Sequence, residues 1–232
     1  MRHSEVAFMD LFKECIPPVQ NNMLIAIGVP AILIYVPLIV VGVPAGIIAF
    51  LVAGGTALLT RGSDAQTGAA MLAVMPIAVI AAIAFAVVYN VIRVGWTNVM
   101  LKMLRGQTAT FGDLAESMPW FVNFLITMVI IGLGTALGTL LFIVPGILIA
   151  IRTSMAPFLV VDRNMTPVAA LIRSNELVTG YSWQILGYFI LYGIANAVAT
   201  NIPIIQFVSG PAAMGYFDLV LARIYLMRQD SR

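Results

Sequence analysis

From Phe142 to Trp183 the chain reads FIVPGILIAIRTSMAPFLVVDRNMTPVAALIRSNELVTGYSW. The first half of this stretch is apolar except for Arg152, and a short polar segment, 162–164, follows it. Apolar sequence resumes at Trp183. A charge-poor segment that ends in polar residues and soon returns to apolar sequence is typical of a chain that leaves a membrane and re-enters it. This stretch therefore indicates how the segments on either side of it are oriented.

The polar part of the stretch predicts a short helix. Thr166 is a suitable N-cap, Pro167 suits the first helical position, and Gly180 is a typical residue just beyond a helix end. Arg173 and Glu176 are spaced to form an i,i+3 ion pair. One side of the helix is apolar and consists of Ala169, Ala170, Ile172 and Leu177. We expect a surface helix that rests on the membrane; the alternative is a coupling helix that contacts a soluble partner such as an ATPase.

The composition indicates that lipid surrounds most of the chain. Of its 232 residues, 61% are hydrophobic and 9% are charged, and the mean hydropathy is +1.02. Soluble domains carry about 25% charged residues, so the charges are too few to cover a globular surface. The formal net charge of +2 and the scattered basic residues argue against nucleic-acid binding. The single cysteine, Cys15, excludes an intrachain disulfide. Since His3 is the only histidine, we expect no metal site and no cofactor.

The N-terminal region predicts an interfacial helix followed by an unusually long apolar run. Residues Ser4 to Ile16 place apolar and charged side chains on opposite helical sides, and Pro17-Pro18 follows them. The run from Asn22 to Thr60 is uncharged and nearly twice the roughly 20 residues that one span needs. Prolines and glycines interrupt it, so it is either two spans or one span with a surplus piece, Val43 to Leu59. That piece is expected to be a re-entrant or interfacial segment of the outer leaflet, or a long tilted extension of the first helix.

Later charge-poor runs predict five further spans. They are a helix from Ala69 to Ile92, a hairpin of two spans from Phe121 to Val161, and two spans between Leu177 and Met227. Gly106 is the expected end of a helix between these runs. The turns of the two hairpins are expected at Pro145-Gly146, with Gly138 as the alternative, and at Asn201-Ile202-Pro203.

The distribution of basic residues distinguishes between the possible span counts. With one span before Arg61, both termini lie on one side, and Arg61 is the only one of the 12 Lys and Arg residues on the other. Basic residues favour the cytoplasmic side. We therefore predict an all-α polytopic integral membrane protein with six transmembrane helices and both termini inside. The chain forms a single membrane domain, 1–232, with an interfacial amphipathic helix at 1–18 and a six-span bundle at 19–232.

Two charges, Arg152 and Asp218, lie far from the ends of the predicted spans. At about 1.5 Å per residue, both lie at a similar depth if their helices reach the inner interface. A charge within a membrane is costly unless it is paired or hydrated. We therefore expect Arg152 and Asp218 to face each other or a shared aqueous cavity, either as a pair that fixes helix register or as a polar site for an ion, substrate or lipid headgroup. Arg93 and Arg223 lie near helix ends, where their side chains can extend to the interface.

The segment VPGILIAIRTSMAPFLVVDRNMTPVAALIRSNELVTG resembles the signature of the bacterial inner-membrane family that includes YciC. It is also similar to the membrane domain fused to some glycerophosphodiester phosphodiesterases. The resemblance rests on Pro145, Gly146, Ile147, Asp162, Ala170, Ser174 and Gly180, and on the ending LARIYLM at 221–227. It implies a six-helix fold in the bacterial inner membrane and a multi-pass protein of an uncharacterised family. It does not imply phosphodiesterase activity, because that domain is not part of this sequence.

These observations favour a non-enzymatic membrane protein that scaffolds, assembles or regulates a membrane complex or lipid organisation. The alternative is a small transporter or channel with a polar site between the fourth and sixth spans, at Arg152 and Asp218. A lipid-modifying enzyme would need converging acid, base or metal-binding groups. The inner-loop carboxylates are not accompanied by a histidine; they are Asp113, Glu116, Asp162 and Glu176. The partners we expect are the lipid bilayer and, as alternatives, a membrane or soluble protein at the cytoplasmic face or a second copy of the chain.

Overall fold

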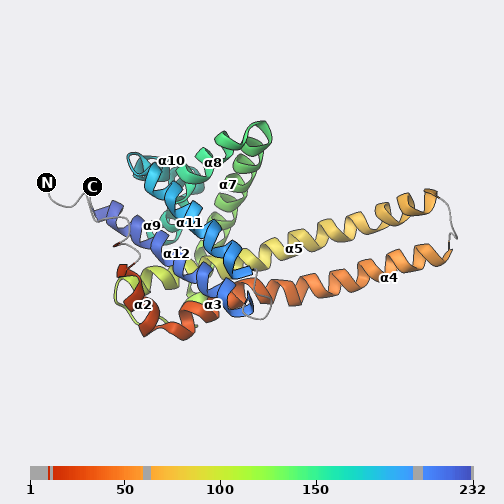
Figure 1. Cartoon of the computed structure of the whole chain (residues 1–232), viewed down its shortest axis with the longest axis horizontal. Helices are drawn as coiled ribbons and strands as arrows, with labels where there is room; N and C mark the ends of the chain where they lie inside the picture. The colour runs from red at the N-terminus through yellow and green to blue at the C-terminus, as the bar shows by residue number, and fades with distance from the viewer. Residues whose placement is uncertain (1–9, 11–12, 60–63, 201–205, 231–232) are drawn as a thin grey trace. The chain divides into compact units, whose positions relative to one another are not determined.

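The computed structural model describes residue 10 and residues 13–59, 64–200 and 206–230, which contain helices and no strand (Figure 1). The helices, in chain order, are α2 (Ile16–Asn21), α3 (Met23–Pro37), the π-helical η1 (Leu38–Gly42), α4 (Val43–Leu59), α5 (Asp64–Leu104), α6 (Asp113–Glu116), the 3-10 helix η2 (Met118–Trp120), α7 (Phe121–Leu141), α8 (Ile143–Thr153), α9 (Ala156–Arg163), α10 (Pro167–Val178), α11 (Ser182–Thr200) and α12 (Gln206–Asp230). The expected all-α class is confirmed.

The chain divides into two compact units. The hairpin unit is Ile32–Val91, and the main unit comprises Met1–Ala31 and Ile92–Arg232. Four segments within the described residues are long and apolar enough to cross a membrane: Met23–Val52, Val74–Leu104, Asp113–Leu141 and Ile143–Arg163. The membrane-protein character that the composition indicates therefore agrees with the helices that the chain forms.

The first apolar run is helical without a loop from Met23 to Leu59. Pro44 has no N–H to donate, and the chain accommodates it with a π-helical turn, in which the Val43 N–H bonds the carbonyl of Leu38, five residues earlier. At about 1.5 Å per residue this run is roughly 55 Å long, whereas the hydrocarbon core of a bilayer is about 30 Å thick. Val43 to Leu59 is therefore a long extension of the first helix, which is one of the alternatives expected from the sequence.

Helix α5 is also longer than the sequence predicts. It has 41 residues with Pro76 inside, and it covers the expected span and continues to Leu104. It ends in a Schellman motif, since Gly106 has φ +72° and its N–H bonds the Met103 carbonyl, while the Gln107 N–H bonds the Lys102 carbonyl. Gly106 thus ends a helix as expected, but that helix is α5 itself. Residues 93–104 are therefore the last three turns of a long helix and not a connecting segment.

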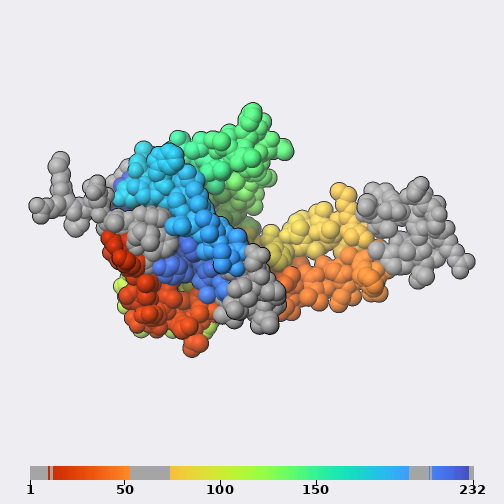
Figure 2. All heavy atoms as spheres, in the orientation of Figure 1, coloured from red at the N-terminus to blue at the C-terminus, as the bar shows by residue number. Residues whose placement is uncertain are grey.

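The hairpin unit presents apolar side chains on both of its arms. This unit contains α4 and the first part of α5 (Figure 1). The atoms of 43–52 and of 74–91 are uncovered along much of their length in Figure 2. Exposed residues on the two arms include Ile47, Phe50, Leu51, Met75, Ile80 and Ile83. Apolar side chains of this kind are stable where lipid or a protein partner surrounds them.

In the main unit, α7 and α8 form a tight hairpin. The turn is at Phe142, whose backbone is extended (φ −159°, ψ 146°), so the turn expected at Pro145-Gly146 is wrong by three residues. Both residues lie in the first helical turn of α8, where proline is tolerated because its N–H would have no helical partner. Gly146 instead permits helix contact: a Cβ there would meet the backbone N and Cα of Thr139 at 2.8 and 2.9 Å.

The segment expected as the fourth span is a broken helix. Helix α8 ends at Thr153, and α9 starts at Ala156 with Pro157 in its first turn. Helix α9 ends at Arg163, and Asn164 after it has the left-handed φ of 49°. Together α8 and α9 make up the candidate span Ile143–Arg163.

Helix α10 has the limits that the sequence predicts. Thr166 is its N-cap residue, Pro167 is its first residue, and Gly180, with φ +87°, follows its end. Arg173 Nη1 donates to Glu176 Oε2 at 2.6 Å, as expected from the spacing. The helix packs against α7, α8 and α9 through its buried side.

Two expectations fall on residues outside those described. Most of the predicted helix from Ser4 to Ile16 lies in 1–9 and 11–12, and the turn at 201–203 lies wholly in 201–205. Within the described part, α2 begins at Ile16 with Pro17 in its first turn. The two prolines therefore lie in the first turn of a helix.

The core of the main unit is assembled from α5, α7, α9 and α12. Helix α12 runs beside α11 (Figure 1) and presents an almost wholly buried face to the other helices. The largest buried side chains include Trp96, Met100, Phe124, Leu219, Ile224 and Tyr225. This core places the polar residues of α5, α9 and α12 within reach of one another.

Candidate functional site

A buried carboxylate, Asp218 on α12, binds two donors from α5. Arg93 binds it with both terminal nitrogens, with Nη1 2.5 Å from Oδ2 and Nη2 3.0 Å from Oδ1. The indole Nε1 of Trp96 donates to Oδ2 at 3.0 Å. The side chain of Asp218 is 9% exposed and that of Arg93 is 21% exposed. Bidentate arginine pairs are among the strong hydrogen-bonded contacts, so this Asp218 cluster joins α5 firmly to α12.

Among the described contacts, Asp218 pairs with Arg93 and Trp96 and not with Arg152, as a direct pair would require; the alternative of a shared aqueous cavity stays a prediction. Both carboxylate oxygens of Asp218 already accept hydrogen bonds from Arg93 and Trp96. Arg152 lies near the end of α8 with an exposed side chain. A buried carboxylate does need a partner, and here that partner comes from α5.

A second buried carboxylate, Asp162 on α9, is held by one donor that directly follows α5 and by another on α12. Arg105, just after α5, donates from Nη2 to Oδ1 at 2.6 Å, and Tyr225 on α12 donates from its hydroxyl to Oδ2 at 2.9 Å. Gln229 then donates to the Tyr225 oxygen at 3.0 Å. The side chain of Asp162 is 6% exposed. This Asp162 cluster connects three helices through one residue of the sequence motif.

The break between α8 and α9 is closed by Ser174 of α10. Its hydroxyl accepts the N–H of Met155 at 3.1 Å and donates to the carbonyl of Arg152 at 2.8 Å. Ser174 is fully buried, and so is Ala170 one turn earlier. A small residue at each position lets α10 approach the break closely. The hydroxyl satisfies backbone groups that the interrupted helix leaves without helical partners.

A third cluster lies between the end of α5 and α6. Lys102 donates to Asp113 Oδ1 at 2.9 Å and to Glu116 Oε2 at 2.7 Å. The other oxygen of Asp113 accepts the N–H of Thr110 at 2.7 Å. Asp113 is buried, and its donors come from both sides of the connecting turn. These contacts fix the α5–α6 connection.

Cys15 is buried near an exposed ion pair. Arg223 on α12 and Glu14 pair through Arg223 Nη2 and Glu14 Oε2 at 3.0 Å. Burial raises the pKa of the Cys15 thiol to about 12; the positive charge of Arg223 lowers this pKa, and the negative charge of Glu14 raises it. A protonated, buried thiol is a weak nucleophile and a poor metal ligand.

The clusters have a common chemical character. Asp113, Asp162 and Asp218 each accept hydrogen bonds from cationic or polar donors of the same chain, and the Ser174 hydroxyl both donates and accepts. Within the described residues, no group of three or more His, Cys, Asp or Glu side chains could hold a metal ion. The arrangement is suited to joining helices and orienting them.

Sequence reasoning missed Arg93, Trp96 and Tyr225 as members of these clusters. The apolar run that stops at Ile92 predicts a helix end near Arg93, but α5 continues for three further turns. Arg93 and Trp96 are spaced i,i+3, which places both on one side of a helix. That spacing, with a charge and an indole donor on the same side, is the signal that could have identified them as partners of a buried carboxylate.

Comparisons of the chain with protein-family models, with curated proteins and with solved structures find no match. The resemblance to the YciC-like family therefore stays a prediction based on the motif residues. In this structure those residues have clear local roles: Gly146 permits the α7–α8 contact, Asp162 joins three helices, and Ser174 closes the α8–α9 break.

Proposed function

We propose that the chain is a YciC-like, multi-pass protein of the bacterial inner membrane that acts as a non-enzymatic scaffold for a membrane complex or for lipid organisation. The observation that supports this role most directly is that two buried carboxylates are already hydrogen-bonded to other residues of the same chain. The carboxylates of Asp162 and Asp218 are each bound by donors from two residues of the same chain. Their chemistry is used to hold helices together, which suits a scaffold.

The proposed topology has six spans with both termini in the cytoplasm. Helices α11 and α12 supply the fifth and sixth spans beside the four candidates named above. The distribution of basic residues supports this topology. The geometry also supports this topology, because residues that it assigns to the inner side lie close together. Arg105 bonds Asp162, and Arg163 and Arg173 line one hollow.

The hairpin unit gives the scaffold a surface for its partner. Its two arms are apolar and exposed, and they extend beyond the hydrocarbon core of about 30 Å, so part of their surface is available to a partner protein. The transporter alternative was based on a polar site formed by Arg152 and Asp218. Since Asp218 pairs with Arg93, that alternative loses the observation on which it depended.

Site-specific photocrosslinking in native membranes tests the scaffold role. A photoreactive amino acid is placed at Phe50 or at Ile80, on the two exposed arms, and at Leu219 as a buried control. The scaffold predicts that Phe50 or Ile80 forms one discrete crosslinked product with a defined protein, and that Leu219 does not. Crosslinks to lipid alone at both arms, together with solute flux through proteoliposomes of the purified protein, would contradict it.

A further inference from the structure

A hollow of about 420 Å³ lies beside α10 in the main unit. Its size falls within the range of about 300–1,000 Å³ that is usual for sites of small ligands. The residues that line it come from α9, the connection to α10, α10 itself and α12; they are Leu159, Arg163, Met165, Arg173, Leu177 and Gln229. All of them belong to one compact unit.

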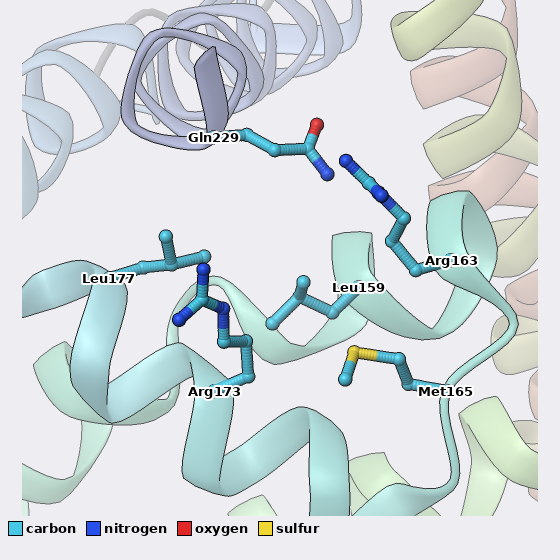
Figure 3. Close-up of a pocket in the computed structure, with 6 residues that line it drawn as sticks. All are labelled: Leu159, Arg163, Met165, Arg173, Leu177 and Gln229. Carbon is cyan, nitrogen blue, oxygen red and sulfur yellow. The ribbon is translucent and has the colours of Figure 1, made fainter. Parts of the chain in front are cut away.

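The lining combines positive charge with apolar surface. Figure 3 shows the side chains of Arg163 and Arg173 on two sides of the hollow, with Leu159 and Met165 between them. Gln229 extends its amide toward the hollow from α12. No carboxylate lines the described wall. Guanidinium groups over an apolar floor match a ligand that has an anionic head and an apolar remainder.

Both arginines keep donors available for such a ligand. Arg173 uses one terminal nitrogen for Glu176, and a guanidinium has five N–H donors. The nearest approach of Arg163 to Asp162 is 3.9 Å, and Asp162 already accepts shorter bonds from Arg105 and Tyr225. The Asp162 cluster therefore fixes the end of α9, and its ion pair with Arg163 is long and involves Nε rather than the two terminal nitrogens.

The surroundings of the hollow favour a lipid over a soluble anion. On the outer side of α10, Val168 and Ile172 are spaced by one turn and are 62% and 59% exposed. Trp183, at the start of α11, is 82% exposed. Exposed apolar residues on a short helix beside an exposed tryptophan are typical of a segment at the membrane interface.

We propose that the hollow beside α10 binds the phosphate of an anionic phospholipid headgroup, with Arg163 and Arg173 as its ligands. The apolar floor then contacts the glycerol and the first part of an acyl chain. This inference stands apart from the scaffold role, because it concerns binding by the purified chain without any partner.

Native mass spectrometry of the purified protein in a neutral detergent tests the site by titration with phosphatidylglycerol. R163Q and R173Q are each expected to weaken binding about fivefold, because one basic residue near a lipid surface contributes about 1 kcal/mol. R152Q is the matched control: it removes an exposed arginine that does not line the hollow, and it should bind as the unchanged protein does. Equal binding by R163Q, R173Q and R152Q would overturn the proposal.

Three further arms of the experiment separate charge, structure and ligand source. E176Q removes the carboxylate that competes for Arg173, so binding should be at least as tight as in the unchanged protein. A loss as large as that of R173Q would show that the ion pair supports the fold and would overturn the assignment. Phosphatidylcholine should bind clearly less well than phosphatidylglycerol. Binding of glycerol 3-phosphate without binding of phosphatidylglycerol would overturn the lipid and indicate a soluble phosphate ester.

Discussion

Asp218 illustrates how a buried charge is stabilised in this protein. Its carboxylate accepts from Arg93 and Trp96, so the negative charge has a bidentate cationic partner and a neutral donor. Removal of one member of a buried ion pair leaves the other without compensation. The cluster therefore contributes specificity to the packing of α5 on α12 and makes that packing sensitive to single changes.

Replacement of Asp218 should destabilise the protein strongly. D218N keeps the size of the side chain but leaves the Arg93 guanidinium without its counter-charge, and we expect a loss of about 3–5 kcal/mol. R152Q changes an exposed arginine and should stay within about 0.5 kcal/mol of the unchanged protein. Thermal unfolding in detergent, followed by tryptophan fluorescence, measures both. Equal unfolding midpoints for the two variants would disprove the role of the cluster.

Cys15 should resist alkylation in the folded protein. Because burial raises its pKa to about 12 from the ordinary 9.0, the thiolate fraction near pH 8 should be about a thousandfold below that of an exposed thiol. The rate of reaction with N-ethylmaleimide should keep rising between pH 8 and 11, and the denatured protein should react at once. A rate that levels off near pH 9 in the folded protein would contradict this expectation.

At the scale of elements, two local features shape the main unit: the α7–α8 contact at Gly146 and the α8–α9 break at Ser174. The Pro-Gly pair was expected to form the turn because it is a frequent turn signal. Proline is equally acceptable in the first turn of a helix, so the sequence pattern could not separate the two positions. Only the packing of Gly146 on Thr139 shows why glycine is needed there.

A side chain at Gly146 should separate α7 from α8. A Cβ there would approach the backbone of Thr139 to 2.8 Å, so G146A is expected to cost about 1–3 kcal/mol. The matched control is G132A on α7, where a Cβ meets nothing within 4 Å. It should be neutral or slightly stabilising, since alanine favours a helix over glycine. The measurement is thermal unfolding of both variants side by side, and an equally stable G146A would refute the close contact.

Loss of the Ser174 hydroxyl should destabilise the junction between α8 and α9. S174A leaves the Met155 N–H and the Arg152 carbonyl without this partner, at a cost of about 1–3 kcal/mol. T179A removes an exposed hydroxyl that bonds Asn175 within its own segment and should have little effect. Hydrogen exchange of residues 152–158 should accelerate in S174A and stay unchanged in T179A. Unchanged exchange in S174A would show that the hydroxyl is not needed at the break.

At the scale of the whole molecule, composition and charge predicted the class of protein well. A chain with 9% charged residues and long uncharged runs has to form apolar helices that lipid can surround. Helix lengths were harder to predict, since Pro44 and Pro76 are typical helix interruptions and yet lie within helical runs. The partners of the buried charges were the hardest features to predict, because they depend on where a helix ends. Arg93 is a partner within the core and not a residue at a helix end, because α5 continues to Leu104.

The most direct test of the six-span account is labelling of single cysteines with a membrane-impermeant maleimide in spheroplasts. In a C15A background, R61C is expected to be labelled from outside. E176C, next to the hollow beside α10, should be labelled only after the membrane is opened, because this account assigns α10 to the cytoplasmic face. Labelling of E176C in sealed spheroplasts, or protection of R61C, would contradict it.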